Sequence, residues 1–284
     1  MAWLWLVLPV IAAVGWMARE ARSNRIVQEE VTLDNLPAAF DGLRVFFISD
    51  IHRREVPEAL IADCMQSGGA DLVLIGGDIR EKGVPLERTR VSLRRLRKLG
   101  PVYAVYGNHD YDEPISRLDE LLRSEQVLPL RNDYAELRDG DERLRICGVD
   151  DPITGHDQLR KALGSYDADS GLRPCVILLS HAPNLIGHLG DAKIDLMLSG
   201  HTHGGQIVLP LVGPLVRNKV VNTYRSGWFV VGNQGRTTKL LVSCGYGTSR
   251  LPLRLLAPAQ THLLVLRSTA AKNRRIAFPA RREQ

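Results

Sequence analysis

The chain has 284 residues, of which 44% are hydrophobic and 24% are charged. This length and composition predict one large domain, or one domain with a small extra element, and exclude general disorder. The formal net charge of +5 is a modest excess that does not by itself indicate nucleic-acid binding, and we expect no nucleic-acid partner. Four widely separated cysteines without a CxxC pair predict buried, reduced thiols in preference to disulfides or a zinc knuckle.

The first stretch of the chain, Met1 to Ala18, contains no charged side chain. As a helix it would reach roughly 27 Å, enough to cross a bilayer core, and Trp3, Trp5 and Trp16 lie toward its ends, where interfacial aromatic residues belong. A cleaved signal peptide usually begins with positive charge, and a core helix usually has a polar face. This stretch has neither, so we predict an uncleaved N-terminal transmembrane helix.

Basic residues follow this stretch directly. They are Arg19, Arg22 and Arg25, with Glu20 the only acid among them. By the positive-inside tendency, the C-terminal side of the helix and the main domain are expected in the cytoplasm. We therefore expect a membrane anchor over residues 1–23, the main domain over 24–267 and a basic C-terminal tail over 268–284, with the membrane as a partner.

From about residue 24 the chain alternates between apolar, strand-like runs and helical patterns. The predicted strands are 43–49 (LRVFFIS), 71–77 (DLVLIGG), 102–107 (VYAVYG), 175–180 (CVILLS) and 194–200 (IDLMLSG). The predicted helices are 56–66, 85–99, 115–125 and 156–163. This alternation indicates an α/β layered fold. From residue 206 onward, shorter strands with glycine and proline turns predict a second, more antiparallel sheet.

Each predicted strand ends at potential metal ligands. The seven candidates are Asp50, His52, Asp78, Asn108, His181, His201 and His203. Loops beyond the carboxyl ends of strands in α/β sheets converge on a single crevice. Oxygen and imidazole ligands without a thiolate suit Mn, Fe or Zn. Seven ligands are too many for one tetrahedral ion, so two divalent ions are expected, which can hold a hydroxide between them and clamp a phosphoryl group.

Five short motifs carry a specific resemblance. They are DIH (50–52), GGD (76–78), GNHD (107–110), SHAP (180–183) and GHTHGGQ (200–206). In this order, over residues 43 to about 210, they resemble the motif blocks of the calcineurin-like metallophosphoesterases. The resemblance implies an α/β fold of two mixed β-sheets sandwiched by helices, with a dimetal centre at the sheet edge.

The resemblance also implies roles for single residues. One ion would be held by Asp50, His52, Asp78 and His203, and the other by Asp78, Asn108, His181 and His201, with Asp78 bridging. His109 matches the family's non-ligand histidine, which contacts the substrate phosphate and is expected to protonate the leaving oxygen. Asp110, the next residue, would orient His109 and favour its charged form. The implied reaction is hydrolysis of a phosphodiester, pyrophosphate or phosphomonoester bond by a metal-bridging hydroxide.

The substrate is less closely defined by the motifs. The apolar N-terminus, the GHTHGGQ block and a late GYGTSRLPLRL (245–255) resemble membrane-associated bacterial members, some of which act on lipid-linked phosphodiesters or pyrophosphates. Arg54 stands where many members have glycine, and it is either a phosphate clamp for the substrate or a solvated loop arginine. The motifs also allow two alternative functions, a nucleotide phosphodiesterase and a phosphoprotein phosphatase. A non-catalytic, membrane-tethered adaptor would be expected to lose ligands or His109, and no such loss is seen. The oligomeric state is not predicted.

Overall fold

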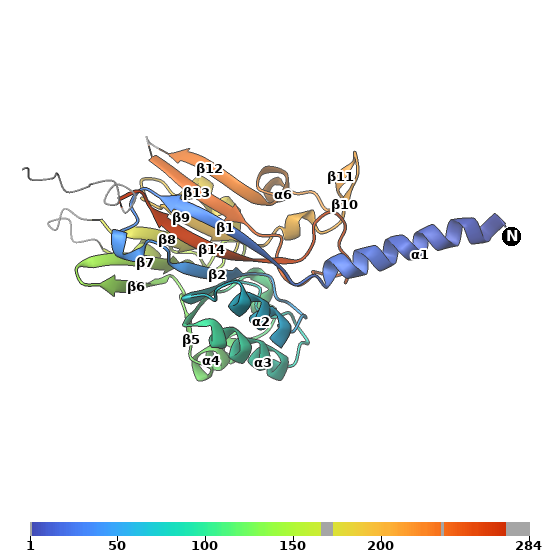
Figure 1. Cartoon of the computed structure of the whole chain (residues 1–284), viewed down its shortest axis with the longest axis horizontal. Coiled ribbons are helices and arrows are strands. Elements are labelled where there is room, and N and C mark those ends of the chain that lie inside the picture. Colours follow the sequence, from blue (N-terminus) through green and yellow to red (C-terminus); the bar gives the residue numbers. More distant parts are fainter. Residues whose placement is uncertain (1, 166–172, 234–235, 271–284) are drawn as a thin grey trace, which may run out of the picture.

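Two six-stranded sheets form the body of the protein (Figure 1). The structure is a computed structural model that describes residues 2–165, 173–233 and 236–270. The first sheet, in spatial order, contains β1 (Arg25–Leu33), β14 (Gln260–Ser268), β2 (Arg44–Ile48), β3 (Leu72–Gly76), β4 (Val102–Val105) and β5 (Val127–Pro129). The second contains β12 (Gly227–Asn233), β13 (Arg236–Val242), β9 (Leu196–Ser199), β8 (Cys175–Leu179), β7 (Glu142–Gly148) and β6 (Asp133–Asp139). Both sheets mix parallel and antiparallel neighbours, which confirms the predicted pair of mixed sheets.

Side-chain alternation along the strands builds three apolar layers. In β2, Phe46 and Ile48 face the helices, whereas Val45 and Phe47 face the second sheet. Because successive side chains of a strand point to opposite faces, a fully apolar strand is buried on both sides. The same rule divides β8, where Ile177 packs between the sheets and the neighbouring Leu178 packs on the outer face of the second sheet. The continuous apolar runs in the sequence are therefore central strands.

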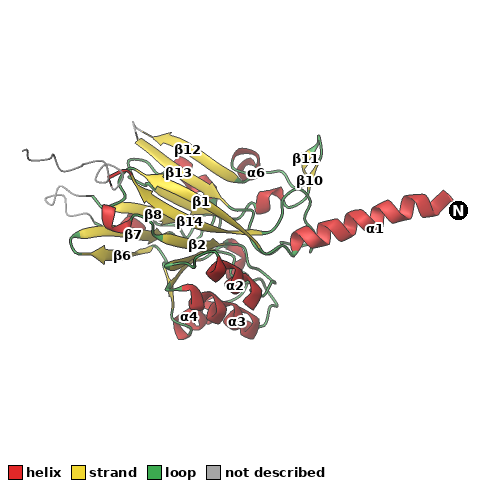
Figure 2. Ribbon diagram, viewed as in Figure 1, coloured by secondary structure: helices red, strands yellow, loops and turns green. Residues whose placement is uncertain are grey.

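Helices α2 (Glu58–Gln66), α3 (Leu86–Leu96) and α4 (Ile115–Ser124) lie together on the outer face of the first sheet (Figure 2). Each follows a proline at its N-cap position, namely Pro57, Pro85 and Pro114. A short helix α5 (Leu159–Leu163) covers the second sheet, so helices flank the pair of sheets as predicted. The smaller elements are β10 (Val208–Leu209), β11 (Gly213–Pro214) and α6 (Lys219–Thr223).

The C-terminal strands do not form a separate antiparallel sheet, and that prediction is wrong. Strands β12 and β13 pair antiparallel with each other, but β13 then runs parallel to β9 and so extends the second sheet. The last strand, β14, enters the first sheet between β1 and β2. Glycine and proline turns predict where strands end, but they carry no information about which edge of a sheet a later strand will join.

The predicted transmembrane anchor is also wrong. Helix α1 (Ala2–Ala21) is present, but no helix in the described residues is both long enough and apolar enough to cross a bilayer. Its uncharged part, from Ala2 to Ala18, rises about 26 Å at 1.5 Å per residue, short of a hydrocarbon core of about 30 Å. The predicted location, a membrane-anchored protein with its main domain in the cytoplasm, rested on this anchor and is therefore wrong as well.

The end of α1 is bound to the main domain. The backbone N–H of Arg254 donates to Met17 O at 3.1 Å, and Ala259 N–H donates to Glu20 O at 3.0 Å. The first part of α1 projects beyond the sheets (Figure 1). The predicted boundaries at residues 23 and 267 stay a prediction, and most of the predicted basic tail, residues 271–284, lies outside the described residues.

Candidate metal centre

All seven predicted ligands follow strands whose carboxyl ends meet at one edge of the two sheets. Asp50 and His52 follow β2, Asp78 follows β3 and Asn108 follows β4, three parallel neighbours in the first sheet. His181 follows β8, and His201 and His203 follow β9, which are parallel neighbours in the second sheet. The sheet topology brings the ligands together, as the sequence predicted.

One group of candidate ligands consists of Asp50, His52 and His203, all buried. The Nε2 atoms of His52 and His203 are 3.1 Å apart, and His203 Nε2 lies 3.6 Å from Asp50 Oδ1. Two imidazole nitrogens and a carboxylate oxygen thus point to one small volume. This is the geometry expected of side chains that share a cation.

A second group lies beside the first. His181 Nε2 is 3.3 Å from Asp78 Oδ2 and 3.3 Å from His201 Nδ1, which in turn lies 3.1 Å from Asn108 Oδ1. Asp78 Oδ2 also lies 3.5 Å from His52 Nε2, so this carboxylate faces both groups. Asp50 is close enough to belong to both groups as well. The bridging role assigned to Asp78 remains a prediction.

The backbone at these ligands is unusual. Positive φ angles of 53°, 51°, 48°, 68° and 51° occur at Asp50, His52, Asp78, His201 and His203, respectively. A left-handed backbone costs a non-glycine residue roughly 1–2 kcal/mol, so surrounding contacts must hold these loops in place. Among these contacts, His201 N–H donates to Asp50 Oδ1 at 3.0 Å and His52 N–H to Asp78 O at 3.1 Å.

Close backbone approach around Asp50 requires glycine. A Cβ atom added at Gly200 would lie 2.2 Å from Asp50 Oδ2, and one added at Gly245 would lie 2.7 Å from Asp50 Cβ. Real Cβ atoms do not approach other heavy atoms so closely. The Asp50 carboxylate is further fixed by the hydroxyl of Ser49, which donates to Oδ2 at 2.6 Å.

The charge states of the buried histidines favour cation binding. Burial lowers the pKa of His52 and lowers that of His203 well below its usual value. Burial, with repulsion from His181, lowers the pKa of His201 to about 4. Burial also opposes charge on His181, but the carboxylates of Asp78 and Asp50 outweigh it and raise the pKa of His181 to about 10. The three neutral imidazoles keep lone pairs available as ligands.

Two orphaned polar atoms also fit a bound metal. His52 Nδ1 and Glu81 Oε2 face each other at 3.8 Å, and neither has a hydrogen-bond partner in the part of the chain that the structure describes. Metal-binding histidines generally donate their other ring N–H to a carboxylate or carbonyl. His181 already follows this pattern, with Nδ1 at 2.9 Å from Gly76 O. The donor set and its surroundings therefore fit divalent metal ions, as predicted from the sequence.

His109 lies beside these groups, with an orienting partner other than the predicted one. Its Nδ1 is 2.8 Å from Asp112 Oδ2, and its backbone N–H donates to Asp78 Oδ1 at 2.9 Å. Asp110 instead accepts the backbone N–H groups of Gly107 at 2.9 Å and Arg80 at 3.0 Å. In the tight 3-10 turn at Asn108–Tyr111, the Asp110 carboxylate caps the start of the turn, so the residue three after His109 reaches its ring.

The pKa of His109 is raised. Its partial burial opposes charge, but the hydrogen bond to Asp112 and the nearby Asp78 carboxylate outweigh that effect. The orienting function predicted for Asp110 thus lies with Asp112, and the charged form of His109 is favoured.

Arg54 does not lie where a phosphate clamp would be needed. Its guanidinium donates to the carbonyl oxygens of Ala21, Arg22, Ser23 and Tyr246, and to Asn24 Oδ1. It also stacks 3.7 Å above the centre of the Tyr246 ring. Its donors are used to hold the segment between α1 and β1 against the loop after β13, and it does not line the pocket described below.

A buried arginine that the sequence analysis did not single out supports the ligand loops. Arg254 is fully buried, and its guanidinium donates to the carbonyl oxygens of His203, Cys244, Gly245, Gly247 and Ala257. It therefore fixes the backbone of a candidate ligand. The only sequence signal was its place in the GYGTSRLPLRL segment, which does not distinguish Arg254 from the neighbouring Arg250.

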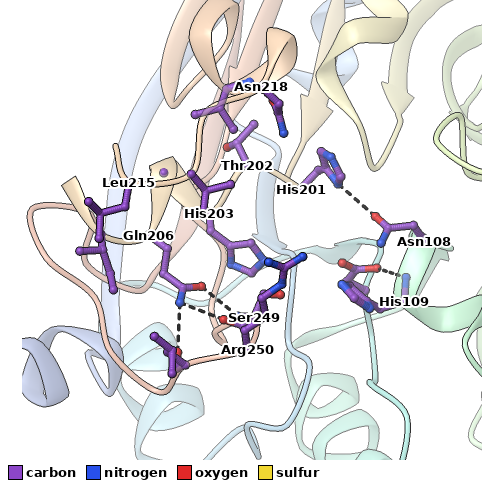
Figure 3. Close-up of a pocket in the computed structure, with 16 residues that line it drawn as sticks. Asn108, His109, His201, Thr202, His203, Gln206, Leu215, Asn218, Ser249 and Arg250 are labelled. Atoms are coloured by element: carbon purple, nitrogen blue, oxygen red, sulfur yellow. Dashed lines mark hydrogen bonds between the residues drawn. The ribbon is translucent and has the colours of Figure 1, made fainter. Parts of the chain in front are cut away.

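A pocket of about 510 Å³ opens beside the candidate ligands. Its polar side contains Asp78, Asn108, His109, His201 and His203, with His201 and Asn108 hydrogen-bonded in Figure 3. Its other lining residues are Thr202, Gly205, Gln206, Ile207, Leu215, Val216, Asn218, Val221, Ser249, Arg250 and Leu251. The candidate ligands are thus accessible to a small molecule on one side.

Comparison with known proteins agrees with this site. Residues 43–205 match the family model described as calcineurin-like phosphoesterase. The uncharacterized protein YpbG of Bacillus subtilis is 33% identical over 92% of this chain and 95% of its own length. The uncharacterized metallophosphoesterase YkuE of the same organism is 30% identical, over 89% of each chain.

A solved structure shares the fold. The 5'-nucleotidase precursor from Thermus thermophilus superposes with a TM-score of 0.51 at 16% identity, over 83% of this chain and 58% of that chain. At this identity the likeness concerns the fold alone. The family model goes further, because its matched region includes every candidate ligand, and the two Bacillus relatives match about nine tenths of this chain at 30% identity or more. The chain therefore belongs to the calcineurin-like phosphoesterase family and is a hydrolase that acts on phosphate esters.

Proposed function

We propose that this phosphoesterase holds two divalent ions, of Mn, Fe or Zn, and hydrolyses a phosphodiester, pyrophosphate or phosphomonoester bond in a substrate that carries an apolar group. The observation that carries the proposal is the convergence of seven oxygen and imidazole ligands from five strand ends, four of which, Asp78, Asn108, His201 and His203, line the pocket. When bound, the ions would supply Lewis-acid activation of a water nucleophile and of the phosphate.

The ligands divide as the contacts group them. Asp50, His52 and His203 would hold one ion, and Asn108, His181 and His201 the other, with Asp78 facing both groups. The strained loops and the glycines around Asp50 keep these side chains preorganised, so little rearrangement accompanies binding of ions or substrate.

His109 would supply a proton to the leaving oxygen. Its Nδ1 is bound to Asp112, which leaves Nε2 as the ring atom available to the pocket. The raised pKa of His109 favours the charged imidazolium, the form that a general acid must have before the reaction. After transfer, Asp112 would hold the neutral ring in the Nδ1–H form.

The apolar side of the pocket supports the substrate class. Ile207, Leu215, Val216 and Leu251 line it together with the candidate ligands, and Leu215 and Leu251 are 57% and 56% exposed. Exposed apolar side chains beside a reactive centre favour a ligand that covers them. We therefore propose that an alkyl or acyl group lies against this wall while the phosphate occupies the metal side, which includes lipid-linked phosphodiesters and pyrophosphates.

The first test concerns the metal and the reaction. Full-length protein should bind close to two divalent ions and hydrolyse an activated aryl phosphate ester, and Asp78→Ala should lose both ions together with activity. Metal content by elemental analysis and release of the aryl alcohol measure these outcomes. One tightly bound ion, with unchanged occupancy in Asp78→Ala, would contradict the bridging arrangement.

The second test concerns the apolar wall. In a series of p-nitrophenyl alkyl phosphodiesters, kcat/KM should rise roughly three- to fourfold per methylene until the chain outgrows the wall. Leu215→Asn should flatten this dependence. Leu211→Asn is the matched control, because Leu211 lies in the neighbouring turn between β10 and β11 and is fully exposed, but does not line the pocket. A wild-type series without chain-length dependence, or a preference for nucleotide esters, would contradict the substrate class.

A further inference from the structure

Arg250 is a cation without a protein partner beside the candidate metal centre. It is the one Lys or Arg among the described residues that line the pocket. Its guanidinium forms no hydrogen bond or ion pair with any residue in 2–165, 173–233 or 236–270. Figure 3 shows the Arg250 side chain directed into the pocket, which His203 also lines. A free guanidinium in this position has five N–H donors available to a ligand.

Four other arginines near the site are already paired. Arg53 forms an ion pair with Glu81 at 2.6 Å, Arg80 with Glu113 at 2.7 Å, and Arg54 and Arg254 donate to backbone carbonyls. The guanidinium groups of these four arginines are therefore not available to a ligand, whereas that of Arg250 is.

The loop that carries Arg250 is held rigidly against the ligand loop. The Gln206 side chain donates to Ser249 O at 2.9 Å and to Leu251 O at 3.0 Å, and it accepts the N–H of Ser249 at 2.9 Å. Gln206 itself lies three residues after His203. Bonds on both sides of Arg250 therefore fix its backbone relative to a candidate ligand, although the residue lies in a loop.

We propose that Arg250 binds a phosphate oxygen of the substrate that the metal ions do not hold. This inference rests on the proposed function, since it presumes that the scissile phosphate lies at the metal centre. The planar guanidinium matches two phosphate oxygens at once, and it keeps its charge at any working pH. The bound oxygen is either the third non-bridging oxygen of a terminal phosphate or an oxygen on the second phosphate of a pyrophosphate.

This assignment makes Arg250 a specificity-determining residue. Each of two ions can take one non-bridging oxygen of the scissile phosphate. A simple phosphodiester has only those two, whereas a monoester has a third and a pyrophosphate carries further oxygens on its second phosphate. Arg250 therefore contributes to the hydrolysis of monoesters and pyrophosphates more than to that of simple diesters.

The test compares Arg250→Ala and Arg250→Lys on three substrates of the metal-loaded, full-length enzyme. These are p-nitrophenyl phosphate, bis(p-nitrophenyl) phosphate and an alkyl pyrophosphate ester. Arg250→Ala should lower kcat/KM roughly 10- to 100-fold on the monoester or the pyrophosphate, the scale of a hydrogen bond to a charged group, and far less on the diester. The substrate with the larger loss identifies the oxygen bound. The kcat/KM of Arg250→Lys should lie between those of the wild type and Arg250→Ala, since an ammonium keeps the charge but lacks the two parallel N–H donors of a guanidinium.

A second readout does not depend on turnover. Calorimetry should show that inorganic phosphate binds the metal-loaded wild type about tenfold or more tightly than it binds Arg250→Ala. Metal content and thermal stability should be unchanged in Arg250→Ala. Arg123→Ala is the charge-matched control, because Arg123 pairs with Asp119 on α4, away from the pocket, and all its values should equal those of the wild type.

Three results would overturn the assignment: unchanged phosphate affinity in Arg250→Ala, equal losses on all three substrates, or loss of metal or stability in that variant. Failure of the proposed function looks different, because the wild type itself would then hydrolyse none of the substrates. In that event the calorimetric comparison with inorganic phosphate would still decide whether Arg250 contacts phosphate.

Discussion

Replacement of Arg254 measures how much a buried guanidinium contributes when backbone carbonyls are its partners. The side chain is fully buried, and it forms no ion pair with a carboxylate in the described parts of the chain. Its hydrogen bonds go to the carbonyl oxygens of His203, Cys244, Gly245, Gly247 and Ala257 and to the ring Nδ1 of His203, at 3.3 Å. Burial lowers its pKa to about 10, so the group is still charged at neutral pH.

The magnitude follows from the carbonyls left behind. Arg254→Met keeps most of the side-chain volume but leaves the carbonyl oxygens of Cys244, Gly247 and Ala257 without their donor. The carbonyl oxygens of His203 and Gly245 still accept the backbone N–H groups of Gln206 and Gln260. Each unpaired carbonyl group costs about 1–3 kcal/mol of stability. The variant no longer has to bury a charged guanidinium, and this offsets part of the cost. We expect a net loss of about 3–5 kcal/mol in the free energy of unfolding, a large share of the 5–15 kcal/mol typical of a domain. Arg254→Lys has three donors at one point and should lose roughly half as much.

Urea unfolding of the metal-free, full-length protein, followed by circular dichroism, measures this loss without a contribution from metal binding. Arg123→Ala, which breaks one exposed i,i+4 pair on α4, is the control and should show no resolvable change. If Arg254→Met unfolded within about 0.5 kcal/mol of the wild type, the carbonyl contacts would be energetically neutral and this reasoning would be refuted.

Three further predictions concern the centre and the core. His109→Asn should retain both metal ions but lose roughly 10²–10⁴ in rate, with a larger loss for poor leaving groups; equal losses would indicate phosphate positioning instead of proton donation. Glu81→Ala should weaken metal affinity roughly 10- to 100-fold, measured with a competing chelator, because His52 Nδ1 would lose the Glu81 carboxylate that lies 3.8 Å away; unchanged affinity would exclude this support. Burial raises the pKa of Cys64 to about 11 and of Cys147 to about 12, so all four thiols should resist a disulfide reagent at pH 8 until the protein is unfolded; fast labelling of the native protein would contradict this.

The sequence predicted the central strands and the ligand positions closely. The run at 43–49 became β2 (Arg44–Ile48) and the run at 175–180 became β8 (Cys175–Leu179), because strands buried on both faces need continuous apolar stretches. Because neighbouring parallel strands end at the same edge of a sheet, the positions of the candidate ligands after these strands sufficed to place them at one edge of the two sheets. The buried, reduced state predicted for the four cysteines is confirmed.

The partners of charged side chains were less predictable. Asp110 and Asp112 are both near His109 in sequence, and only the 3-10 turn decides which carboxylate reaches its ring. Arg54 and Arg250 are both loop arginines. The role of Arg54 depends on its contact with Tyr246, almost 200 residues away, whereas that of Arg250 depends on the absence of a partner in the described chain. The prediction of a membrane span at α1 failed for a different reason. It rested on an uncharged stretch, a reach that just matched a bilayer core and tryptophans toward its ends, but the helix is not long and apolar enough to span.

The position of β14 has a consequence for the order in which this protein forms during synthesis. β14 is the only described neighbour of β1, and its register pairs Arg25 with Gln260 across most of the chain length. It also covers the edge of β2, the strand that precedes Asp50. A ribosome will therefore have released every candidate ligand before the first sheet is complete, and β1 waits unpaired until residues 260–268 emerge. A nascent chain stalled before that point leaves the backbone edges of β1 and β2 unpaired, so we expect late truncations of this fold to aggregate.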